Sequence, residues 1–569
     1  MSKRKAVPLA QLEPKRADDK PIVTIAIDFG TAGTGYAYSF TGSDVIEAKE
    51  PGGQDARKTL TNLLLNDDGS FRAFGFEARR QYSESGTGAF FSNYKMLLEN
   101  VGGRATDTMA KAYNGKTHKL IDVIKQTLKF VKDEALKECG RALPDGLTAR
   151  ECQWVLTVPA IWSDAAKGFM RTAAFQAGLM DTEDSRRLLL ALEPESAAIA
   201  CDVAQLVKPG QAFMVLDTGG GTVDITINRL KSTSPLKFDE IAAPSGGPWG
   251  STLIDYRFEM FVTALVGQRN FDAAKASSYW IELLENWEAV KISQTADDAT
   301  RTINFSPLLE VLGEGTTLPN LVDTYNQIHG TSLKMRGRST IIMEAQFVRD
   351  LFKPNFDKIV HHVQELLDAN HLDFIFLVGG FAESALLQAA VKDNFSRRCK
   401  VVIPVRPGLA VLRGAAQFGA NQDVFASRVA RFSYGFNYAS LYDATNAKHV
   451  AKGFKDTMTP EGLVKYVYDK FHQLVKVGDK LPAGHVAESD KNGPISAGQN
   501  TIAFEIFATP LGQIDWTTES SARKIGTVIV DCLYEERCTI QLQFGATEIT
   551  ATATNEVTGK AANATLRYE

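Results

Sequence analysis

Short apolar runs alternate with segments of helical periodicity along roughly the first 420 of the 569 residues. Runs rich in β-branched or aromatic residues predict buried strands at 22–27, 213–216 and 374–378. Apolar residues spaced three and four apart predict helices at 122–137, 163–178, 195–207, 253–266, 278–293, 359–367 and 409–419. Strands that alternate with helices are typical of an α/β fold.

Beyond about residue 422 the pattern becomes extended, with turns between successive runs. Runs at 502–507, 524–530, 538–544 and 547–552 predict a small β-rich C-terminal domain. We therefore expect four parts: a disordered basic tail at 1–20, two α/β units at 21–210 and 211–420, and the β-rich domain at 421–569.

Two predicted hairpins each carry an aspartate and a glycine-rich tip. Asp28 precedes the tip at 29–35, and Asp217 opens the tip at 217–222. Glycines let successive backbone N–H groups converge on an anion. One Asp–Gly tip is more often a plain turn. Two tips suggest a site that clamps a polyphosphate from both sides, with Asp28, Asp217 and Asp224 as partners of Mg²⁺ through its waters.

Composition and motifs exclude several functional classes. The 63 Lys and Arg residues against 67 Asp and Glu give a net charge of −4, which argues against a nucleic-acid binder. No window is apolar enough for a membrane helix, and the first twenty residues lack the apolar core of a secretory signal. Neither a P-loop, GxxxxGK(S/T), nor a GxGxxG dinucleotide fingerprint after a strand occurs. The six scattered cysteines indicate thiols rather than disulfides or zinc ligands. We expect a cytoplasmic protein, and basic pairs in the tail leave a nuclear location open.

Five motifs in order resemble the ATPase domain of the 70-kDa heat-shock protein family, a two-lobed actin-like ATPase fold built from duplicated ribonuclease-H-like units. They are 27–31 (IDFGT), 157–160 (TVPA), 192–199 (LEPESAAI), 216–224 (LDTGGGTVD) and 378–380 (VGG). The chain is most similar to the 70-kDa heat-shock protein 12 branch. That similarity lies in 35–40, 378–384, 405–411, 545–549 and 557–559. In this interpretation 21–210 is the first ATPase lobe and 211–420 the second.

The resemblance implies ATP or ADP and Mg²⁺ as ligands. It implies catalytic roles for Lys95, Glu193 and Asp224, and contact with Mg²⁺ through water for Asp28 and Asp217. The residues expected to bind the nucleotide are Gly30, Thr31, Ala32, Gly219, Gly220, Gly221, Thr222, Gly250, Glu288, Lys291, Thr295, Gly379, Gly380 and Phe381. Two alternatives stay open: Lys95 as a solvated lysine, and the i, i+3, i+7 set of Glu288, Lys291 and Thr295 as an ordinary surface stripe.

The chain also departs from the family. Ala32 replaces a threonine of the first phosphate loop, Glu383 replaces an arginine that stacks on adenine, Gly408 replaces an acidic residue, and Ile292 replaces a basic one. Compared with the family pattern, each change would weaken nucleotide contacts and so lower affinity and turnover. The stretch 421–428 has no leucine-rich linker, and no length remains for a helical lid. We therefore expect a chain ending near Gln422 to keep its nucleotide affinity.

The interpretation is an ATP-binding, slowly hydrolysing protein similar to 70-kDa heat-shock proteins, with a chaperone-like role. Its C-terminal domain would bind a protein partner, with no nucleic acid and no membrane span, and the protein would be a monomer. One alternative is a non-hydrolysing, ATP-dependent adaptor. A sugar or acid kinase of the same superfold is a weaker alternative, because Glu193 between a strand and Pro194 fits the heat-shock pattern better.

Overall fold

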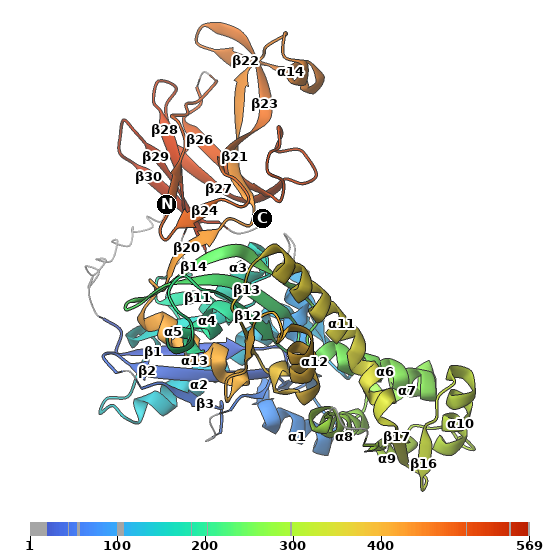
Figure 1. Ribbon diagram of the computed structural model, residues 1–569. Coiled ribbons are helices and arrows are strands. Elements are labelled where there is room, and N and C mark those ends of the chain that lie inside the picture. Colours follow the sequence, from blue (N-terminus) through green and yellow to red (C-terminus); the bar gives the residue numbers. More distant parts are fainter. Residues whose placement is uncertain are drawn as a thin grey trace, which may run out of the picture.

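The computed structural model describes residues 20–43, 45–53, 57–99, 107–183, 185–201, 203–295, 299–496, 498–544 and 548–566. The basic tail at 1–19 and residues 545–547 of one motif lie outside the described residues. The fold is mixed α/β, with two large sheets in the body of the molecule and two further antiparallel sheets in the orange-to-red C-terminal part (Figure 1). The α/β prediction is therefore confirmed.

The first large sheet has the order β11-β10-β1-β2-β3, and β4 adds to β2. β1 pairs antiparallel with β2 and parallel with β10. All seven residues of β1 are buried, because helices cover both faces of this sheet. The strands are β1 (Val23–Phe29), β2 (Gly33–Phe40), β3 (Glu47–Lys49), β4 (Thr59–Leu60), β10 (Cys152–Val158) and β11 (Leu188–Leu192). Two helices in its core are α2 (Leu120–Gly140) and α3 (Asp164–Gln176).

The second large sheet contains a similar antiparallel hairpin next to parallel strands. Its order is β19-β18-β12-β13-β14-β20-β24, and the antiparallel β12–β13 pair corresponds to β1–β2. The strands are β12 (Ala212–Thr218), β13 (Val223–Thr233), β14 (Leu236–Gly247), β18 (Phe374–Val378), β19 (Lys400–Val402), β20 (Phe425–Val429) and β24 (Lys480–Pro482). The helices packed with it include α6 (Thr252–Val266), α7 (Gln268–Lys275), α8 (Tyr279–Ser293), α11 (Ala345–Ala369) and α12 (Ala385–Phe395).

Two helices cross between the sheets and lock them together. α4 (Glu193–Ala200) follows β11 of the first sheet, yet its Ala197 and Ala198 lie in a core with residues of β12. α13 (Ala410–Ala420) conversely packs beneath β1 and β10. Where they cross, a Cβ on Gly414 would lie 1.6 Å from the Ser196 carbonyl oxygen. Only glycine permits this approach, and it fixes the position of α4, which begins with Glu193.

Three sequence-based boundaries need correction. The second sheet continues past residue 420, because β20 pairs in parallel with β14 and β24 pairs with β20. The helix expected at 195–207 is instead α4 and a separate short α5 (Val203–Leu206). The helix expected at 359–367 is part of the 25-residue α11, which accommodates Pro354 in its interior.

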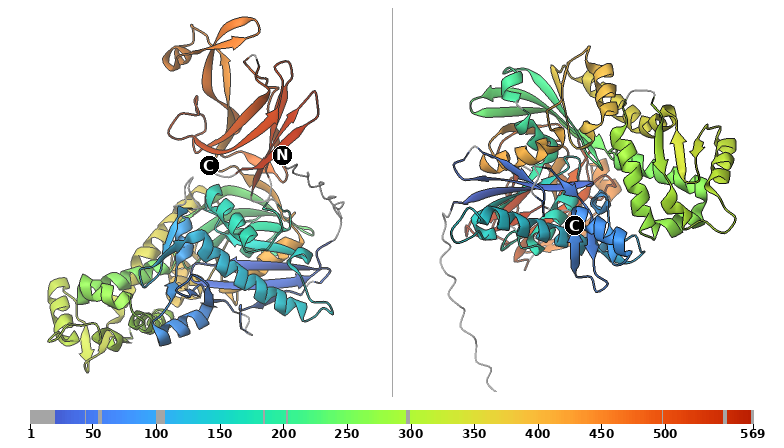
Figure 2. Two further views of the ribbon diagram at one scale, coloured as in Figure 1. Left: turned by 180° about the vertical axis from the view of Figure 1, so that it is seen from behind. Right: turned by 90° about the horizontal axis from the view of Figure 1, so that it is seen from below.

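Smaller elements extend the two halves. Near the first sheet lie a three-stranded sheet and a hairpin: β5 (Leu63–Leu65), β6 (Phe71–Phe74), α1 (Gly75–Ser85), β7 (Ala89–Phe91), η1 (Tyr94–Leu98), β8 (Met109–Lys111) and β9 (Thr117–Lys119). On the second half, an outlying group holds β15 (Arg301–Asn304), α9 (Ser306–Leu309), α10 (Leu318–His329), β16 (Lys334–Arg336) and β17 (Thr340–Met343). Both views in Figure 2 show this yellow-green group projecting from the body.

The C-terminal part is built from two antiparallel sheets. Buried and exposed residues alternate along their strands. The buried residues of the two sheets share one apolar core around Ile506, Ile525 and Ile540. The five-stranded sheet holds β21 (Ser433–Leu441), β22 (Lys455–Thr459), β23 (Gly462–Val475), β26 (Thr501–Thr509) and β27 (Arg523–Asp531). The four-stranded sheet holds β25 (Val486–Glu488), β28 (Cys538–Phe544), β29 (Ile549–Asn555) and β30 (Ala561–Thr565). A short helix, α14 (Ala447–Lys452), lies at the far tip (Figure 1).

The thiol prediction agrees with the structure: all six cysteines are buried and none is in a disulfide. Among the described helices, none combines the length and apolar composition that a membrane crossing requires.

Candidate functional site

A cavity of about 590 Å³ lies between the two glycine hairpins. Most of the predicted site residues meet there: Asp28, Gly30, Thr31, Ala32, Lys95, Glu193, Asp217, Gly219, Gly220, Gly221, Thr222, Glu288, Lys291, Gly379, Gly380 and Phe381. Asp224 and Gly250 lie just behind this lining, and Thr295 does not reach it. The tertiary fold thus gathers residues from Asp28 to Phe381, more than 350 positions apart in sequence, into one space.

The two hairpin tips touch each other. A Cβ on Gly220 would lie 2.8 Å from the Cβ of Ala32, and one on Gly221 would lie 2.5 Å from Thr31 Oγ1. Gly250 supports the second tip from behind, because its N–H donates to the Gly221 carbonyl at 3.0 Å. The glycines are therefore required by loop-on-loop packing, which leaves the backbone N–H groups of both tips beside the cavity.

Lys95 and Glu193 form a buried ion pair, with Lys95 Nζ 2.8 Å from Glu193 Oε1. Lys95 is carried by η1, which follows Asn93 at φ +54, a left-handed conformation that asparagine tolerates. Its ammonium also lies 5.1 Å from the centre of the Trp162 ring. Lys95 is only 3% exposed, so the solvated-lysine alternative is wrong.

Glu193 begins α4, where Pro194 presets the first helical turn. Burial raises the pKa of Glu193 to about 7, although the attraction of Lys95 opposes that shift. A carboxyl group with such a pKa is half ionised near neutral pH, which suits a group that accepts a proton from water.

Asp217 and Asp224 face each other across the second hairpin. Burial, followed by the charges of Glu193 and Asp224, raises the pKa of Asp217 well above its ordinary value. Burial also raises the pKa of Asp224, which is anchored by the Ile161 N–H at 2.9 Å from Oδ1. Burial and crowding of carboxyl groups therefore disfavour negative charge on this side of the cavity.

Lys58 is a site residue that the sequence patterns did not reveal. Its Nζ lies 2.5 Å from Asp28 Oδ2, and both residues line the cavity. Burial disfavours the charged form of Lys58, but the attraction and hydrogen bond of Asp28, together with the charges of Asp217 and Glu193, raise the pKa of Lys58. Lys58 lies 30 positions from Asp28, outside every motif, and only the pairing of β4 with β2 brings it there.

A magnesium ion fits these residues only in part. Thr157 Oγ1 donates to Asp28 Oδ1 at 3.1 Å and Lys58 holds Oδ2, so both oxygens of Asp28 are engaged. Asp217 remains as a carboxylate that faces the cavity. Within the described ranges, no three His, Cys, Asp or Glu side chains gather in an arrangement that could hold a metal ion. We therefore derive no chemical step from a bound metal.

The far end of the cavity is formed by α8, with Glu288 and Lys291 on its lining. Both are held by ion pairs: Glu288 by Arg79 at 2.8 Å and Lys291 by Asp255 at 2.7 Å. The prediction that Thr295 shares this helical face is wrong, because α8 ends at Ser293 and the backbone is extended at the next residue. Ile292 lines the cavity in its place and is 73% exposed.

Two further polar residues line the same end. Glu383 reaches over Gly408, since a Cβ there would lie 2.8 Å from Glu383 Oε1. Arg406, which no sequence pattern singled out, lines the cavity as well. Below them Gly379 adopts φ +91, and a Cβ would lie 2.4 Å from Asp217 Oδ1. Glycine at 379 thus lets the strand end at β18 approach Asp217.

The C-terminal part reaches close to the cavity. Arg428 of β20 pairs with Glu195, two residues after Glu193, and its Nη2 donates to Glu195 Oε2 at 2.8 Å. Arg171 of α3 makes a two-pronged contact with Glu548, at 2.8 and 2.6 Å. A smaller cavity of about 240 Å³ lies at this junction. The C-terminal part and the α/β part therefore meet through buried ion pairs rather than through an open linker.

Comparisons with known proteins agree with the motifs. The chain is 29% identical to the heat shock 70 kDa protein 12A of Mus musculus, over 97% of this chain and 92% of that protein. It is 27% identical to the heat shock 70 kDa protein 12B of Homo sapiens, over 96% and 91%. The chaperone protein DnaK of Metamycoplasma hominis is 25% identical over 57% of this chain and 49% of its own length. No protein-family model matches the chain. The resemblance to the 70-kDa heat-shock protein 12 branch is confirmed.

Proposed function

We propose that this chain, similar over nearly its whole length to heat shock 70 kDa proteins 12A and 12B, binds ATP between two lobes and hydrolyses it slowly. The lobes would be the two large sheets with their helices, arranged as in the actin-like ATPase fold. The observation that carries the proposal is the meeting of two glycine tips beside the buried Lys95–Glu193 pair in one cavity. A cavity of about 590 Å³ is in the range of small-molecule sites.

The phosphates would lie against the backbone N–H groups of the two tips, with the hydroxyls of Thr31 and Thr222 beside them. Lys95 would neutralise charge on the terminal phosphate and, with Glu193, orient the attacking water. The water oxygen bonds to the terminal phosphorus, the bond to the bridging oxygen breaks, and Glu193 accepts the proton. ADP and phosphate result. Asp224 accepts a hydrogen bond from the Ile161 N–H, and its charge would help to position the Lys95 ammonium.

The base would lie at the α8 end of the cavity. Glu288 and Lys291 present polar atoms there in fixed positions, because each is held by an ion pair. Gly379, Gly380 and Phe381 also line the cavity. Ala32 supplies no hydroxyl and the exposed Ile292 supplies no charge, which supports slow turnover and modest affinity.

The C-terminal sheets would bind a protein partner in a chaperone-like role. Their paired strands leave edges at β22 and β27, at the ends of the five-stranded sheet. Unpaired strand edges are where extended segments of other proteins add to a sheet.

A second candidate function is a non-hydrolysing adaptor that uses ATP as a structural ligand. The engagement of both Asp28 oxygens favours it, because Asp28 is one of the two residues, with Asp217, that were expected to contact Mg²⁺ through water. Single-turnover hydrolysis of radiolabelled ATP separates the two functions. Release of phosphate at a rate that depends on Lys95 supports the ATPase, and no release from bound ATP supports the adaptor.

Binding itself is tested by calorimetry and by thermal melting with millimolar ATP. A ligand at 100 times its dissociation constant stabilises the folded state by about 2.7 kcal/mol. We expect a rise in the melting temperature with ATP and none with an equal ionic strength of sodium sulfate. The absence of both heat and a melting shift would refute the proposed function in either form.

A further inference from the structure

Strand pairing and two glycines of the first hairpin determine where the Lys58 side chain lies. Lys58 directly precedes β4, and β4 pairs with the start of β2, the return strand of the first glycine hairpin. The lysine stem lies along that strand: a Cβ on Gly33 would lie 3.4 Å from Lys58 Cβ, and one on Gly35 would lie 3.1 Å from Lys58 Cγ. Any larger residue at 35 would crowd this track. Because Gly33 and Gly35 have no side chains, the Lys58 stem can lie against the hairpin and its ammonium can reach the cavity.

At the end of this track the ammonium meets Asp28, with 2.5 Å between Lys58 Nζ and Asp28 Oδ2. The pair is shielded from solvent, since the Asp28 side chain is 4% exposed and that of Lys58 is 21% exposed. The other Asp28 oxygen accepts the Thr157 hydroxyl. Asp28 is therefore paired within the protein, and its negative charge is balanced by a lysine at Oδ2.

The charges of the cavity explain why a resident cation is useful there. Three carboxylates line it beside the tips, at Asp28, Glu193 and Asp217. Lys95 is committed to Glu193, and Lys291, on α8, is committed to Asp255. Lys58, whose stem lies along the first glycine hairpin, is the remaining ammonium among the described lining residues. A nucleoside triphosphate would bring several further negative charges next to Gly30 and Thr31. Without a second fixed cation, that charge would meet unscreened carboxylates in a poorly solvated space.

We propose that Lys58 is the resident cation of the phosphate site and that this chain binds nucleoside triphosphate without a divalent metal ion. The inference rests on the proposed function, because it concerns the same cavity and ligand. Lys58 bridges Asp28 and the phosphates from a fixed position, as a point charge on a long stem can do. Asp217 then stays near the phosphates without a metal partner, which agrees with its pKa being raised by burial and by the charges of Glu193 and Asp224.

The test measures affinity for the non-hydrolysable analogue AMP-PNP by calorimetry, in excess EDTA and again in millimolar magnesium. For the full-length wild-type chain, we expect the two dissociation constants to agree within about threefold, less than 1 kcal/mol. In Lys58→Met, Asp28 is freed, so we expect affinity to fall about tenfold or more in EDTA and to return with magnesium. Lys58→Arg keeps the charge and should behave like the wild type. Lys129→Met, an exposed lysine on α2, is the control.

Folding is checked separately, because removing Lys58 leaves Asp28 buried without its partner. The double variant Lys58→Met with Asp28→Asn removes both charges and should fold with the melting temperature of the wild type within a few degrees. It should also bind poorly in EDTA, since the cation is still missing. If this variant binds as well as the wild type without metal, Lys58 is not the cation that matters and the inference is wrong.

Two other results overturn the inference in distinguishable ways. Wild-type affinity that collapses about tenfold or more in EDTA would mean that Lys58 is only the ion-pair partner of Asp28, while the proposed function stands. Absence of nucleotide binding in both conditions would remove the proposed function and this inference together.

Discussion

The guanidinium of Arg79 lies 2.8 Å from both Glu285 and Glu288, and one side chain thereby joins α1 to α8. α1 packs with the small sheet near the first half, whereas α8 forms the end wall of the cavity. Ile281 of α8 reinforces the contact by packing into the apolar cluster around Tyr82 and Phe90. A ligand at the far end of the cavity therefore lies beneath a contact between the two halves.

Loss of this contact should speed nucleotide release. In Arg79→Met the ion pairs to α8 are lost, and a partly exposed pair contributes about 1 kcal/mol, equivalent to roughly fivefold in rate. We expect dissociation of a fluorescent ATP analogue, followed by stopped flow, to quicken by about that factor.

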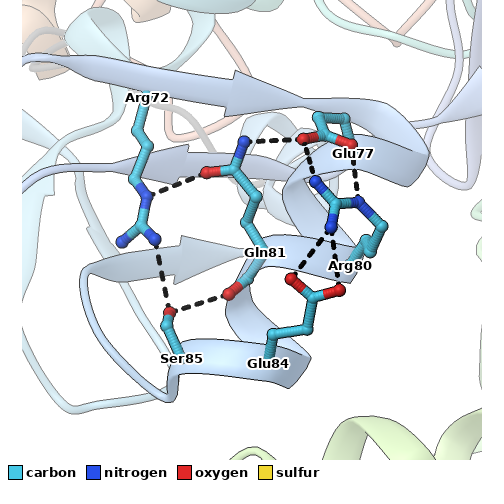
Figure 3. A network of polar contacts seen from close by, with 6 residues as sticks. All are labelled: Arg72, Glu77, Arg80, Gln81, Glu84 and Ser85. Carbon is cyan, nitrogen blue, oxygen red and sulfur yellow. Dashed lines mark hydrogen bonds and ion pairs between the residues drawn. The ribbon is translucent and has the colours of Figure 1, made fainter.

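Arg80 offers a matched control on the same helix. Figure 3 shows its guanidinium between Glu77 and Glu84, and all three residues belong to α1. Arg80→Met removes one arginine and a comparable number of ion pairs without touching α8. Its release rate should equal that of the wild type, and equal acceleration by both variants would contradict the role given to Arg79.

The Lys95–Glu193 pair should matter for chemistry more than for binding. Lys95→Ala and Glu193→Ala should each lower single-turnover hydrolysis by about tenfold or more, or about 1.4 kcal/mol in the barrier. ATP affinity should change much less. Identical low rates in the wild type and both variants would instead favour the adaptor.

Hydrolysis should depend on pH through Glu193. Its pKa is raised to about 7, and the group must be ionised to accept a proton. The single-turnover rate should therefore rise with pH through about 7 and level off above it. Lys95→Ala removes the attraction that favours the ionised form, so its profile should shift to higher pH. A flat profile between pH 6 and about 8 would count against Glu193 as the proton acceptor.

The Arg428–Glu195 pair should couple the C-terminal part to the rest of the chain. Arg428→Met leaves the buried Glu195 carboxylate without its partner, which costs about 3 kcal/mol in the free energy of unfolding. Adding Glu195→Met should restore much of that stability, as measured by urea unfolding of the double-mutant cycle. Additive losses in the two single variants would show that the residues act independently.

Glu240 should make stability pH-dependent. Burial, followed by the charge of Glu195, raises its pKa from 4.5 to about 7, while its Oε2 accepts the Val429 N–H. The folded state then binds more protons than the unfolded state between those values, so this contribution to stability falls as pH rises from 4.5 through 7. Glu240→Gln keeps an acceptor for Val429 and removes the titration. The difference in unfolding free energy between wild type and variant should change by up to about 3 kcal/mol over that range.

Local pattern predicted much of the secondary structure. The strand at 374–378 has the bounds of β18, and the Ser163 cap predicted for α3 accepts the N–H of Ala166. These features depend on neighbours a few residues apart, so sequence spacing contains them. The truncation expected near Gln422 is different. The structure argues against an unaffected product, because ending there removes β20 from the edge of β14.

The sequence by itself determined the two glycine tips, the aspartates beside them and the candidates Lys95 and Glu193. Each belongs to a short motif, which can be recognised without knowing how the chain folds. Only the tertiary structure decided which charges meet. Lys58 reaches Asp28 through strand pairing, and Arg79 reaches Glu288 across 209 positions. Arg428 reaches Glu195 because a strand of the C-terminal part completes the second sheet. Such pairs depend on which surfaces come together on folding, and local periodicity does not show which residues far apart in the sequence will meet.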